Sequence, residues 1–329
     1  MSVPTVFRRL EPAQTSLVYD TYWRFATERQ DIFFRRFQGT PPPWTTDPIL
    51  AVHKFTNAYR ASDRVSQFLI RHVIYEGSQQ PEEVLFRTIL FKLFNSINTW
   101  RLLKRELGSL TWSTFTFGQY DAILTEALAR GERIYSAAYI MPSGGWGYDR
   151  KHRNHLMLVD MMMRDRLAAR IGRTKQLREV YELLRTFPTI GSFLAYQFAI
   201  DLNYSELIDF SESSFVVPGP GALDGITKCF SNFGGLSETD LIKLVTERQT
   251  EEFQQRGLKF RSLFGRPLQL IDCQNLFCEI SKYARIAHPD VKGVSDRTRI
   301  KQKFRPISDS ITLWYPPKWK INEQIEKGT

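Results

Sequence analysis

The feature that most constrains the fold is a run of apolar residues at helical spacing. After Pro81, apolar side chains recur every three or four residues as far as Trp100, which is the period of one face of an α-helix and not of a β-strand. Pro81 suits the first turn of a helix, where a backbone N–H has no intrahelical partner. The sequence therefore predicts an amphipathic helix from Pro81 that buries Leu85, Phe86, Ile89, Leu90, Leu93, Phe94, Ile97 and Trp100.

Further helices are expected along most of the chain. Residues 19–37 have helical composition and end before the prolines at 41–43, which cannot continue a helix. Asp47 and Pro48 are an N-cap and first-turn pair, after which a helix is expected to continue from Ile49 to Tyr75. Other helices are expected over 120–130, through 161–169, over 238–257 and over 270–286, with a glycine-rich loop at 143–147.

These elements predict an all-α protein with two helical lobes around a cleft. We expect an N-terminal tail over 1–18 and a helical domain over 19–287. An irregular, basic C-terminal segment over 288–329 should pack on that domain, with one apolar stretch at 311–315. No flexible interior linker and no repeat with a period of about 20–50 residues is apparent.

Composition narrows the class of protein. Hydrophobic residues make up 42% of the 329 residues, which is enough for a core and excludes disorder over most of the chain. No apolar run approaches the ~18 residues of a membrane span, and residues 1–10 do not resemble a signal peptide. Three cysteines and five scattered histidines show no metal-ligand spacing. We therefore expect a cytoplasmic protein without a membrane anchor, metal or cofactor.

The charge balance favours a polyanionic partner. The chain has 45 basic and 35 acidic residues, a formal net charge of +10. Lys and Arg that neutralise phosphates release condensed counterions, so a surplus of this size favours DNA binding. A solvated basic surface without a nucleic-acid partner is the alternative. No obligate protein partner is evident.

The segment 177–200 contains a candidate DNA-binding hairpin. An apolar helical stripe that begins at Leu177 is followed by Pro188, Ile190, Gly191 and Ser192, and then by a second apolar helix. This helix, turn and helix resembles the helix–hairpin–helix of DNA repair proteins. Gly191 would let the backbone approach DNA closely, and free N–H groups at the second helix would bind a phosphate. An ordinary corner between two helices is the alternative.

A carboxylate downstream of the hairpin is the candidate catalytic group. Leu223-Asp224-Gly225 resembles the Leu-Asp-Gly motif of adenine-removing DNA glycosylases, although about a dozen additional residues separate it from the hairpin. A carboxylate would stabilise the positive charge that develops on the sugar as an N-glycosidic bond breaks. Asp201, with Asp209 and Glu212, lies in the same stretch and is a rival, and a plain helix cap is the alternative for Asp224.

Several further motifs resemble one family. They are Pro43–Leu50, Phe55–Arg60 with Asp63-Arg64, Phe91–Asn95, Thr99-Trp100, Ala138–Pro142, Gly191–Gln197, Val217–Ala222, Cys278–Tyr283 and Pro316–Trp319. Together they resemble the helical domain of phage 5-hydroxymethyluracil DNA kinases and the α-glutamyl/putrescinyl thymine pyrophosphorylases. These proteins of DNA base hypermodification are considered relatives of the DNA glycosylases. The resemblance implies action on modified bases in DNA, with some stand-alone relatives resembling glycosylases that defend bacteria against phages.

Motif and chemistry together suggest which residues surround a flipped-out base. Asn57, Arg60, Asp63 and Arg64 are expected on two turns of one helix, with an internal ion-pair network as the alternative. The whole expected base pocket comprises Trp44, Asn57, Arg60, Asp63, Arg64, Tyr139, Glu279 and Lys282. Besides the hairpin, the expected DNA-backbone contacts are Lys151, Arg153, Gly219 and Gly221.

The main prediction is a monofunctional DNA glycosylase that excises a 5-substituted pyrimidine from phage DNA carrying modified bases. Asp224 is the expected catalytic group, with Asp201 as its rival. One alternative is a hypermodification enzyme in which an activated hydroxymethyl pyrimidine loses pyrophosphate to an amine. A non-catalytic module that binds modified DNA is the other. The sequence has no Gly-x-x-x-x-Gly-Lys-Ser/Thr run, so we do not expect this chain to transfer phosphoryl groups from ATP.

Overall fold

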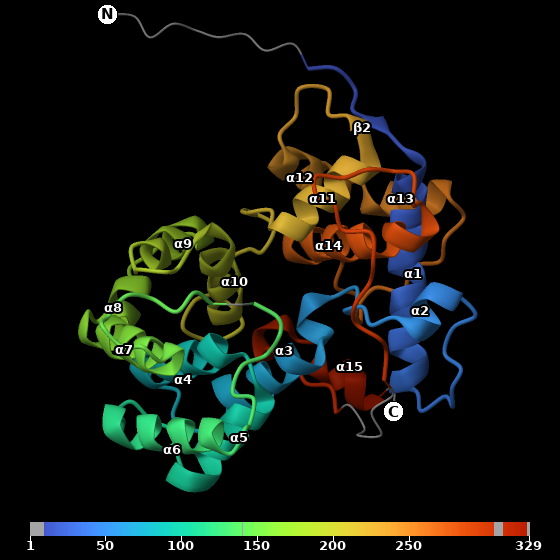
Figure 1. The fold of residues 1–329 in the computed structure, drawn as a ribbon. Coiled ribbons are helices and arrows are strands. Elements are labelled where there is room, and N and C mark those ends of the chain that lie inside the picture. The colour runs from blue at the N-terminus through green and yellow to red at the C-terminus, as the bar shows by residue number, and fades with distance from the viewer. Residues whose placement is uncertain (1–9, 140, 306–311, 328–329) are drawn as a thin grey trace, which may run out of the picture. The chain divides into compact units, whose positions relative to one another are not determined.

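Helices form almost all of the regular structure in the computed structural model, which describes residues 10–139, 141–305 and 312–327 (Figure 1). The prediction of an all-α fold is therefore confirmed. Contacts divide the described chain into two compact units. Unit 1 contains the residues up to Asp63, those from Val216 to Thr312 and those from Gln324 on, and unit 2 contains Arg64–Phe215 and Leu313–Glu323. The predicted segments 1–18 and 288–329 lie partly outside the described residues.

Unit 1 is built around two long helices, α1 (Leu17–Phe37) and α14 (Leu270–Ala287). The Ser16 side chain accepts a hydrogen bond from the Val18 N–H at 3.1 Å and so caps the start of α1. Tyr22 of α1 packs on Phe277 of α14, with their ring centroids 4.7 Å apart. The remaining elements are α2 (Pro48–Val52), a 3-10 turn η1 (Arg60–Ser62), α11 (Pro220–Cys229), α12 (Glu238–Glu247), α13 (Gln249–Gln255) and the antiparallel strands β1 (Gln14–Thr15) and β2 (Phe230–Asn232).

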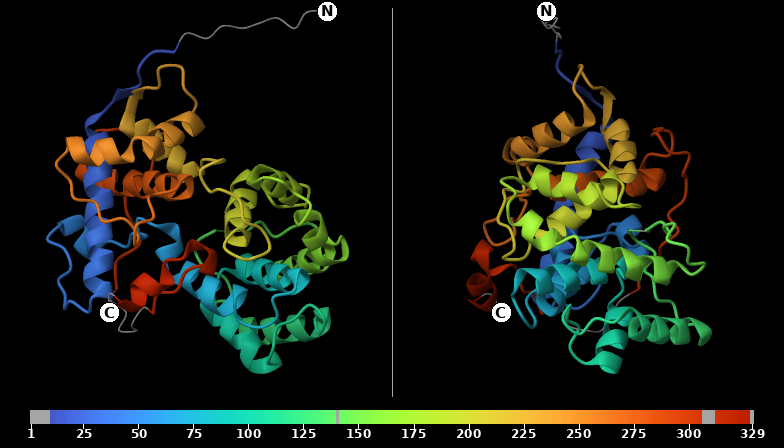
Figure 2. Two further views of the ribbon diagram at one scale, coloured as in Figure 1. Left: turned by 180° about the vertical axis from the view of Figure 1, so that it is seen from behind. Right: turned by 90° about the vertical axis from the view of Figure 1, so that its left-hand side faces the viewer.

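The helices α11 and α14 lie side by side at very short range (Figures 1 and 2). A Cβ atom on Gly225 would overlap the carbonyl group of Phe277, and one on Gly221 would overlap the Cys278 side chain. Gly221 and Gly225 are four residues apart, so they share one face of α11. Glycine at both positions therefore allows this helix to contact the α14 backbone directly.

Unit 2 surrounds α4 (Pro81–Phe94), which is buried on every side from Val84 to Phe94. The helix predicted from Pro81 is present and its apolar residues are buried, but it is not amphipathic, because neighbouring helices cover the polar face as well. Arg87 on that face donates hydrogen bonds to the carbonyl groups of Val73 and Ser78. The other elements are α3 (Arg64–Phe68), a π-helical turn η2 (Leu69–Ile74), α5 (Ile97–Leu107), α6 (Phe117–Ala129), α7 (Lys151–Arg164), α8 (Leu167–Ile171), α9 (Leu177–Arg185), α10 (Ser192–Leu202) and a 3-10 turn η3 (Pro317–Trp319).

Two helix predictions are wrong in extent. The helix expected up to Trp100 ends at Phe94, because Asn95 adopts a left-handed conformation (φ 49°) and Ser96 caps the next helix. The helix expected over 238–257 divides at Arg248. The C-terminal segment, expected to be irregular, also contains α15 (Asn322–Lys327).

A third helix prediction, from Ile49 to Tyr75, is also wrong, because the chain leaves the helical conformation between Val52 and Arg60. Side chains, and not a helical ladder, satisfy the backbone there. Arg29 donates to the Thr56 carbonyl oxygen, and the carboxylates of Glu279 and Asp63 accept from the Thr56 and Asn57 N–H groups. Such side-chain bonds compete with helix formation.

Candidate functional site

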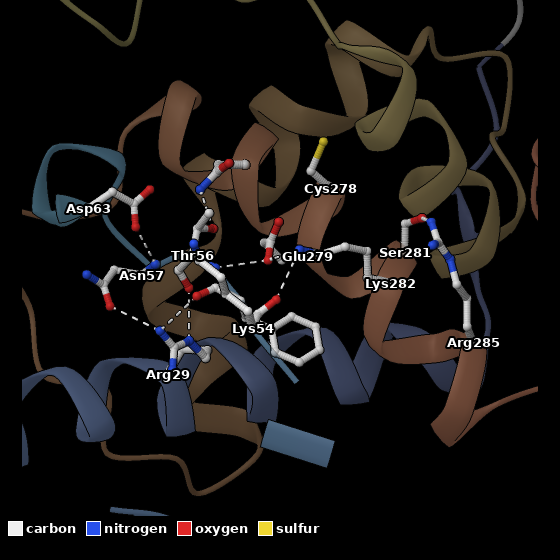
Figure 3. Close-up of polar contacts among 12 residues, drawn as sticks. Arg29, Lys54, Thr56, Asn57, Asp63, Cys278, Glu279, Ser281, Lys282 and Arg285 are labelled. Atoms are coloured by element: carbon white, nitrogen blue, oxygen red, sulfur yellow. Dashed lines mark hydrogen bonds and ion pairs between the residues drawn. The ribbon is translucent and has the colours of Figure 1, made fainter. Parts of the chain in front are cut away.

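The interrupted segment lies at the centre of a polar cluster in unit 1 (Figure 3). Residues 54–57 belong to no helix or strand. Side chains bind the backbone of Thr56 and Asn57, and the Lys54 N–H donates to the Gln302 carbonyl oxygen. Helix α1 contributes one charged group, α14 contributes two, and the chain just after η1 contributes a carboxyl group. We call this group the Thr56 cluster, and its members are Arg29, Thr56, Asn57, Asp63, Glu279 and Lys282.

Arg29 is the cluster residue that the sequence analysis missed. Its Nε donates to the Thr56 carbonyl oxygen at 2.9 Å, and its Nη2 donates to Asn57 Oδ1 at 3.1 Å. Burial lowers its pKa to about 10. The available signal was a charged residue on the otherwise apolar face of α1, since Ala26 and Phe33 on either side of Arg29 are buried.

Asn57 is fully engaged with protein. Its Oδ1 accepts from Arg29, and its Nδ2 donates to the Ser62 carbonyl oxygen at 2.8 Å. Its backbone N–H donates to Asp63 Oδ1 at 2.8 Å. Asn57 and Asp63 are therefore in contact, but in a loop and not on one helix as predicted. The side-chain oxygen and nitrogen of Asn57 thus both bond protein groups that hold this loop.

Glu279 and Lys282 form an ion pair on α14, with 2.7 Å between Nζ and Oε2. The same Glu279 oxygen accepts from the Thr56 N–H at 3.0 Å, and Lys282 Nζ donates to the Lys54 carbonyl oxygen at 3.4 Å. Glu279 is buried, whereas the Lys282 side chain is 23% exposed. The pair predicted from helical spacing thus fastens the 54–57 backbone to α14, and part of the Lys282 side chain remains exposed.

Asp63 is the group in the cluster whose pKa is moved close to neutral pH. Burial raises its pKa to about 7, and the nearby Glu279 carboxylate adds to this, while the Asn57 N–H, Arg29 and Arg60 act in the opposite direction. Asp63 remains partly accessible. A carboxyl group with this pKa can donate a hydrogen bond in its protonated form, or accept a proton in its ionised form, close to pH 7.

Asp224, the predicted catalytic residue, is fully engaged in the interior of unit 1. It lies one turn into α11 and is 1% exposed. Its Oδ2 pairs with Lys228 Nζ at 3.2 Å and accepts from the Ser281 hydroxyl group, and its Oδ1 accepts from the Ser295 N–H at 2.7 Å. Burial acts to raise its pKa, but these hydrogen bonds and the Lys228 charge hold the pKa below its ordinary value.

A second charged group lies in unit 2 and includes two predicted residues. Asp201 of α10 forms a buried ion pair with Lys92 of α4, with 3.1 Å between Lys92 Nζ and Oδ2. The same Nζ lies 4.4 Å from the Tyr139 ring centroid. Tyr139 stacks on Phe193 at the start of α10, with centroids 5.9 Å apart, and both rings are partly exposed. Lys92 was also missed, although a lysine within an apolar helix is a recognisable signal.

The predicted hairpin consists of α9, a connection over 186–191 and α10. Gly191 has φ −74°, which any residue adopts, and a Cβ atom there would meet no atom within 4 Å. The strained position is Thr189, with φ 67°. Gly191 is thus not required by the conformation or packing of the described chain, and its close approach to DNA stays a prediction. Pro188 and Ser192 are accessible, whereas Ile190 is buried.

The remaining predicted residues are dispersed and mostly engaged. Arg153 pairs with Asp121 at 2.8 Å, and Lys151 lies 4.4 Å from the Tyr135 ring centroid. Trp44 is partly exposed, with the Arg36 guanidinium 5.1 Å from its ring centroid. The others are Arg60, which is buried in η1; Arg64, exposed at the start of α3; Asp209, exposed with Lys318 3.5 Å away; Glu212, buried; and Gly219, the N-cap residue of α11.

The described residues form neither a metal-binding cluster nor a membrane-spanning helix. No group of three or more His, Cys, Asp or Glu side chains in them is arranged to hold a metal ion. None of the helices in these ranges has both the length and the apolar character needed to cross a membrane.

The fold places the chain among all-α proteins. Comparison with known proteins identifies a family within this class. Residues 16–293 match the family described as "5-hmdU DNA kinase, helical domain". The chain belongs to this family. A relative from Bacillus phage SP10, named 5-hmdU DNA kinase, is 28% identical over 297 residues, which are 84% of this chain and 46% of the relative. The chain thus spans less than half the length of that curated relative. No solved structure matches it.

The family corrects the main functional prediction. A DNA glycosylase is a hydrolase, whereas the family and the phage relative are named for a kinase, which is a transferase. The prediction of a glycosylase, with Asp224 or Asp201 as its catalytic carboxylate, is therefore wrong. The contacts of Asp224 agree with this correction, because each of its oxygens is occupied by protein donors.

Proposed function

We propose that this chain binds DNA containing a 5-hydroxymethyl pyrimidine and takes part in the hypermodification of that base. The observation that carries the proposal is the family match over residues 16–293, which includes most of both units. The formal net charge of +10 supports a DNA partner. Binding of the modified strand requires no nucleotide-binding loop, so the proposal is compatible with a sequence that has none.

The Thr56 cluster is the proposed recognition site for the 5-hydroxymethyl group. A hydroxyl group both donates and accepts hydrogen bonds, and the cluster offers a partly exposed ammonium, Lys282, and a partly accessible carboxyl group, Asp63. A site built to bond a hydroxyl group disfavours an analogue that lacks it, because its own polar groups are then left unpaired at a cost of about 1–3 kcal/mol. Thymidine is such an analogue.

The test is a comparison of two DNA duplexes that differ at one base. We expect the protein to bind a fluorescent duplex with one 5-hydroxymethyldeoxyuridine at least about tenfold more tightly than the thymidine duplex, since 1.4 kcal/mol is a factor of ten. Asp63→Asn should remove most of this preference and leave the affinity for the thymidine duplex unchanged. Asp290→Asn, at an exposed aspartate of the same unit, is the matched control. Equal affinities of the wild-type protein for the two duplexes would contradict the proposal.

A second candidate function is catalysis of the displacement itself. An amine nitrogen would attack the 5-methylene carbon of a pyrophosphorylated hydroxymethyl pyrimidine. The carbon–oxygen bond would break, and pyrophosphate would leave with the electron pair. The proton lost by the amine needs an acceptor, and the observation that favours this function is the pKa of Asp63, about 7.

This second candidate predicts a pH profile. The base must be ionised to accept a proton, so the rate should rise with pH through about 7 and then level off. Mass spectrometry of nucleosides after incubation with the pyrophosphorylated DNA and an amine would show a heavier nucleoside, and Asp63→Asn should abolish it. If the protein binds the DNA but the nucleoside mass is unchanged at every pH, the second candidate is contradicted and binding remains as the proposed function.

A further inference from the structure

A basic segment outside the Thr56 cluster follows the end of α14. Residues 297–305 have a basic side chain at every second position and no acidic residue. All five basic side chains are exposed, and within the described chain none of them forms an ion pair. The matched family range ends at residue 293, before this segment. We call it the basic strip, and its cations are Arg297, Arg299, Lys301, Lys303 and Arg305.

The backbone of the strip is bound to the helices of unit 1. Two residues before the strip, the Ser295 N–H donates to the buried Asp224 carboxylate at 2.7 Å. On α14, about one turn beyond Lys282, Arg285 Nη1 donates to the Arg299 carbonyl oxygen at 3.1 Å. Both contacts use main-chain atoms of the strip or of the residues just before it, so they fix its path and leave its basic side chains exposed.

The far end of the strip pairs with the chain that leads into the Thr56 cluster. His53 and Lys303 form an antiparallel bridge, in which the Lys54 N–H donates to the Gln302 carbonyl oxygen at 3.0 Å and the Phe304 N–H donates to the Val52 carbonyl oxygen at 2.9 Å. The Lys54 carbonyl oxygen in turn accepts from Lys282. Lys54 therefore connects the two sites: its N–H bonds the strip, and its carbonyl oxygen bonds Lys282 of the Thr56 cluster.

Two apolar side chains attach the strip to unit 1, whereas Thr298 and Gln302 are exposed, as the basic residues are. Ile300 and Phe304 are partly buried, and Phe304 packs edge-on against Trp44 with centroids 6.3 Å apart. The intervening basic residues are exposed. In extended chain, alternate residues point to the same side and lie about 6.6–6.8 Å apart.

We propose that the basic strip holds the phosphodiester backbone of the DNA strand whose base enters the Thr56 cluster. This inference rests on the proposed function for the identity of the ligand and adds where the phosphates bind. Five exposed cations on a pre-ordered backbone would contact phosphates without a further cost of ordering the main chain. Such contacts are independent of base sequence, so the strip supplies affinity and the cluster supplies the preference for the modified base.

The experiment compares two variants with the same reduction in charge. In the strip variant, all five basic residues are changed to Gln. In the control variant, five exposed basic residues elsewhere are changed to Gln, namely Arg24, Arg133, Arg173, Lys175 and Lys259. The affinities for the 5-hydroxymethyldeoxyuridine and thymidine duplexes are measured by fluorescence anisotropy over a range of salt concentrations, and circular dichroism checks that both variants are folded.

We expect the strip variant to lose at least about tenfold in affinity for both duplexes at low salt, while their affinity ratio stays at the wild-type value. The slope of log affinity against log salt should decrease by about 0.9 for each phosphate that the variant no longer neutralises. The control variant should keep most of the wild-type slope. Equal reductions in affinity for the two variants, or a wild-type slope in the strip variant, would overturn the inference.

The two proposals fail in different ways. If wild-type protein binds both duplexes equally and the strip variant alone loses affinity, the proposed function fails and the strip remains a DNA-backbone site. If wild-type protein prefers the modified duplex and the strip variant behaves as the control does, the proposed function stands and the strip is not its backbone site.

Discussion

At the scale of single residues, the interior of unit 1 depends on charged groups that are completely engaged. Asp224 accepts hydrogen bonds from two serines and pairs with Lys228, whose Nζ also donates to the Ser281 carbonyl oxygen at 3.1 Å. A buried charge that loses its partner costs several kcal/mol, because it stays desolvated without compensation. Asp224 is therefore a structural residue, and its removal tests that role directly.

Asp224→Asn should lower the free energy of unfolding by about 3 kcal/mol at pH 7, because Lys228 would remain buried without an anion. The folded-state pKa of Asp224 lies below its ordinary value, so its contribution is present above about pH 4 and is lost as pH falls through the folded pKa. Urea unfolding at pH 7 and near pH 3 measures this, and the difference between variant and wild type should shrink in acid. The exposed control Asp290→Asn should change little at either pH, and an effect of Asp224→Asn no larger than that of the control would refute the role.

Some residues of the Thr56 cluster could be predicted from the sequence, and others could not. The Glu279–Lys282 pair follows from helical spacing, and the structure brings both residues into the Thr56 cluster with Asn57 and Asp63. Arg29 could not be assigned to this cluster, because its partners lie more than 25 positions away along the chain. Long-range partners of this kind are not visible in the local pattern of one helix.

At the scale of elements, the contact between α11 and α14 explains a glycine pair that the sequence analysis assigned to other roles. Gly221 was predicted to contact DNA, and Gly225 was part of the Leu-Asp-Gly motif. In the structure both lie on the face of α11 that touches α14, and neither position has room for a Cβ atom. Close packing of two helices accounts for these glycines without a ligand.

Gly225→Ala should destabilise the protein by about 2 kcal/mol or more, because the new methyl group would overlap the Phe277 carbonyl group and force the helices apart. Gly118→Ala in α6 is the matched control. A Cβ atom at Gly118 meets no atom within 4 Å, and alanine in a helix is favoured over glycine by about 0.5–1 kcal/mol. The two substitutions should therefore shift the thermal midpoint in opposite directions. A Gly225→Ala variant with a midpoint as high as or higher than that of the wild type would show that α11 and α14 separate without cost.

At the scale of the whole molecule, the chain forms two units, each with its own buried helices and its own internal ion pair. Asp224 and Lys228 pair in unit 1, and Lys92 and Asp201 pair in unit 2. Unit 1 is assembled from chain segments that are far apart in sequence, since α1 and α14 are separated by most of the chain. Regions with separate cores can open independently of one another.

Hydrogen exchange of the Gly225→Ala variant tests this independence. We expect faster exchange in α11 and α14, which the substitution separates, and wild-type protection in α4, α9 and α10 of unit 2. Mass spectrometry of peptides from each unit measures the two responses in one experiment. A decrease in protection to the same extent in α4 and in α14 would mean that the two units unfold as a single cooperative body.

The sequence by itself determined the helical class, the positions of most helices and the family resemblance, because these depend on local periodicity, prolines and short motifs. It did not determine which polar residues would meet, or where helices would be interrupted. Only the tertiary structure decided that Arg29, Glu279 and Asp63 replace the helical ladder at Thr56 and Asn57. The physical reason is that a backbone group is satisfied by whichever donor or acceptor the fold brings to it, and those partners come from helices that are distant in sequence.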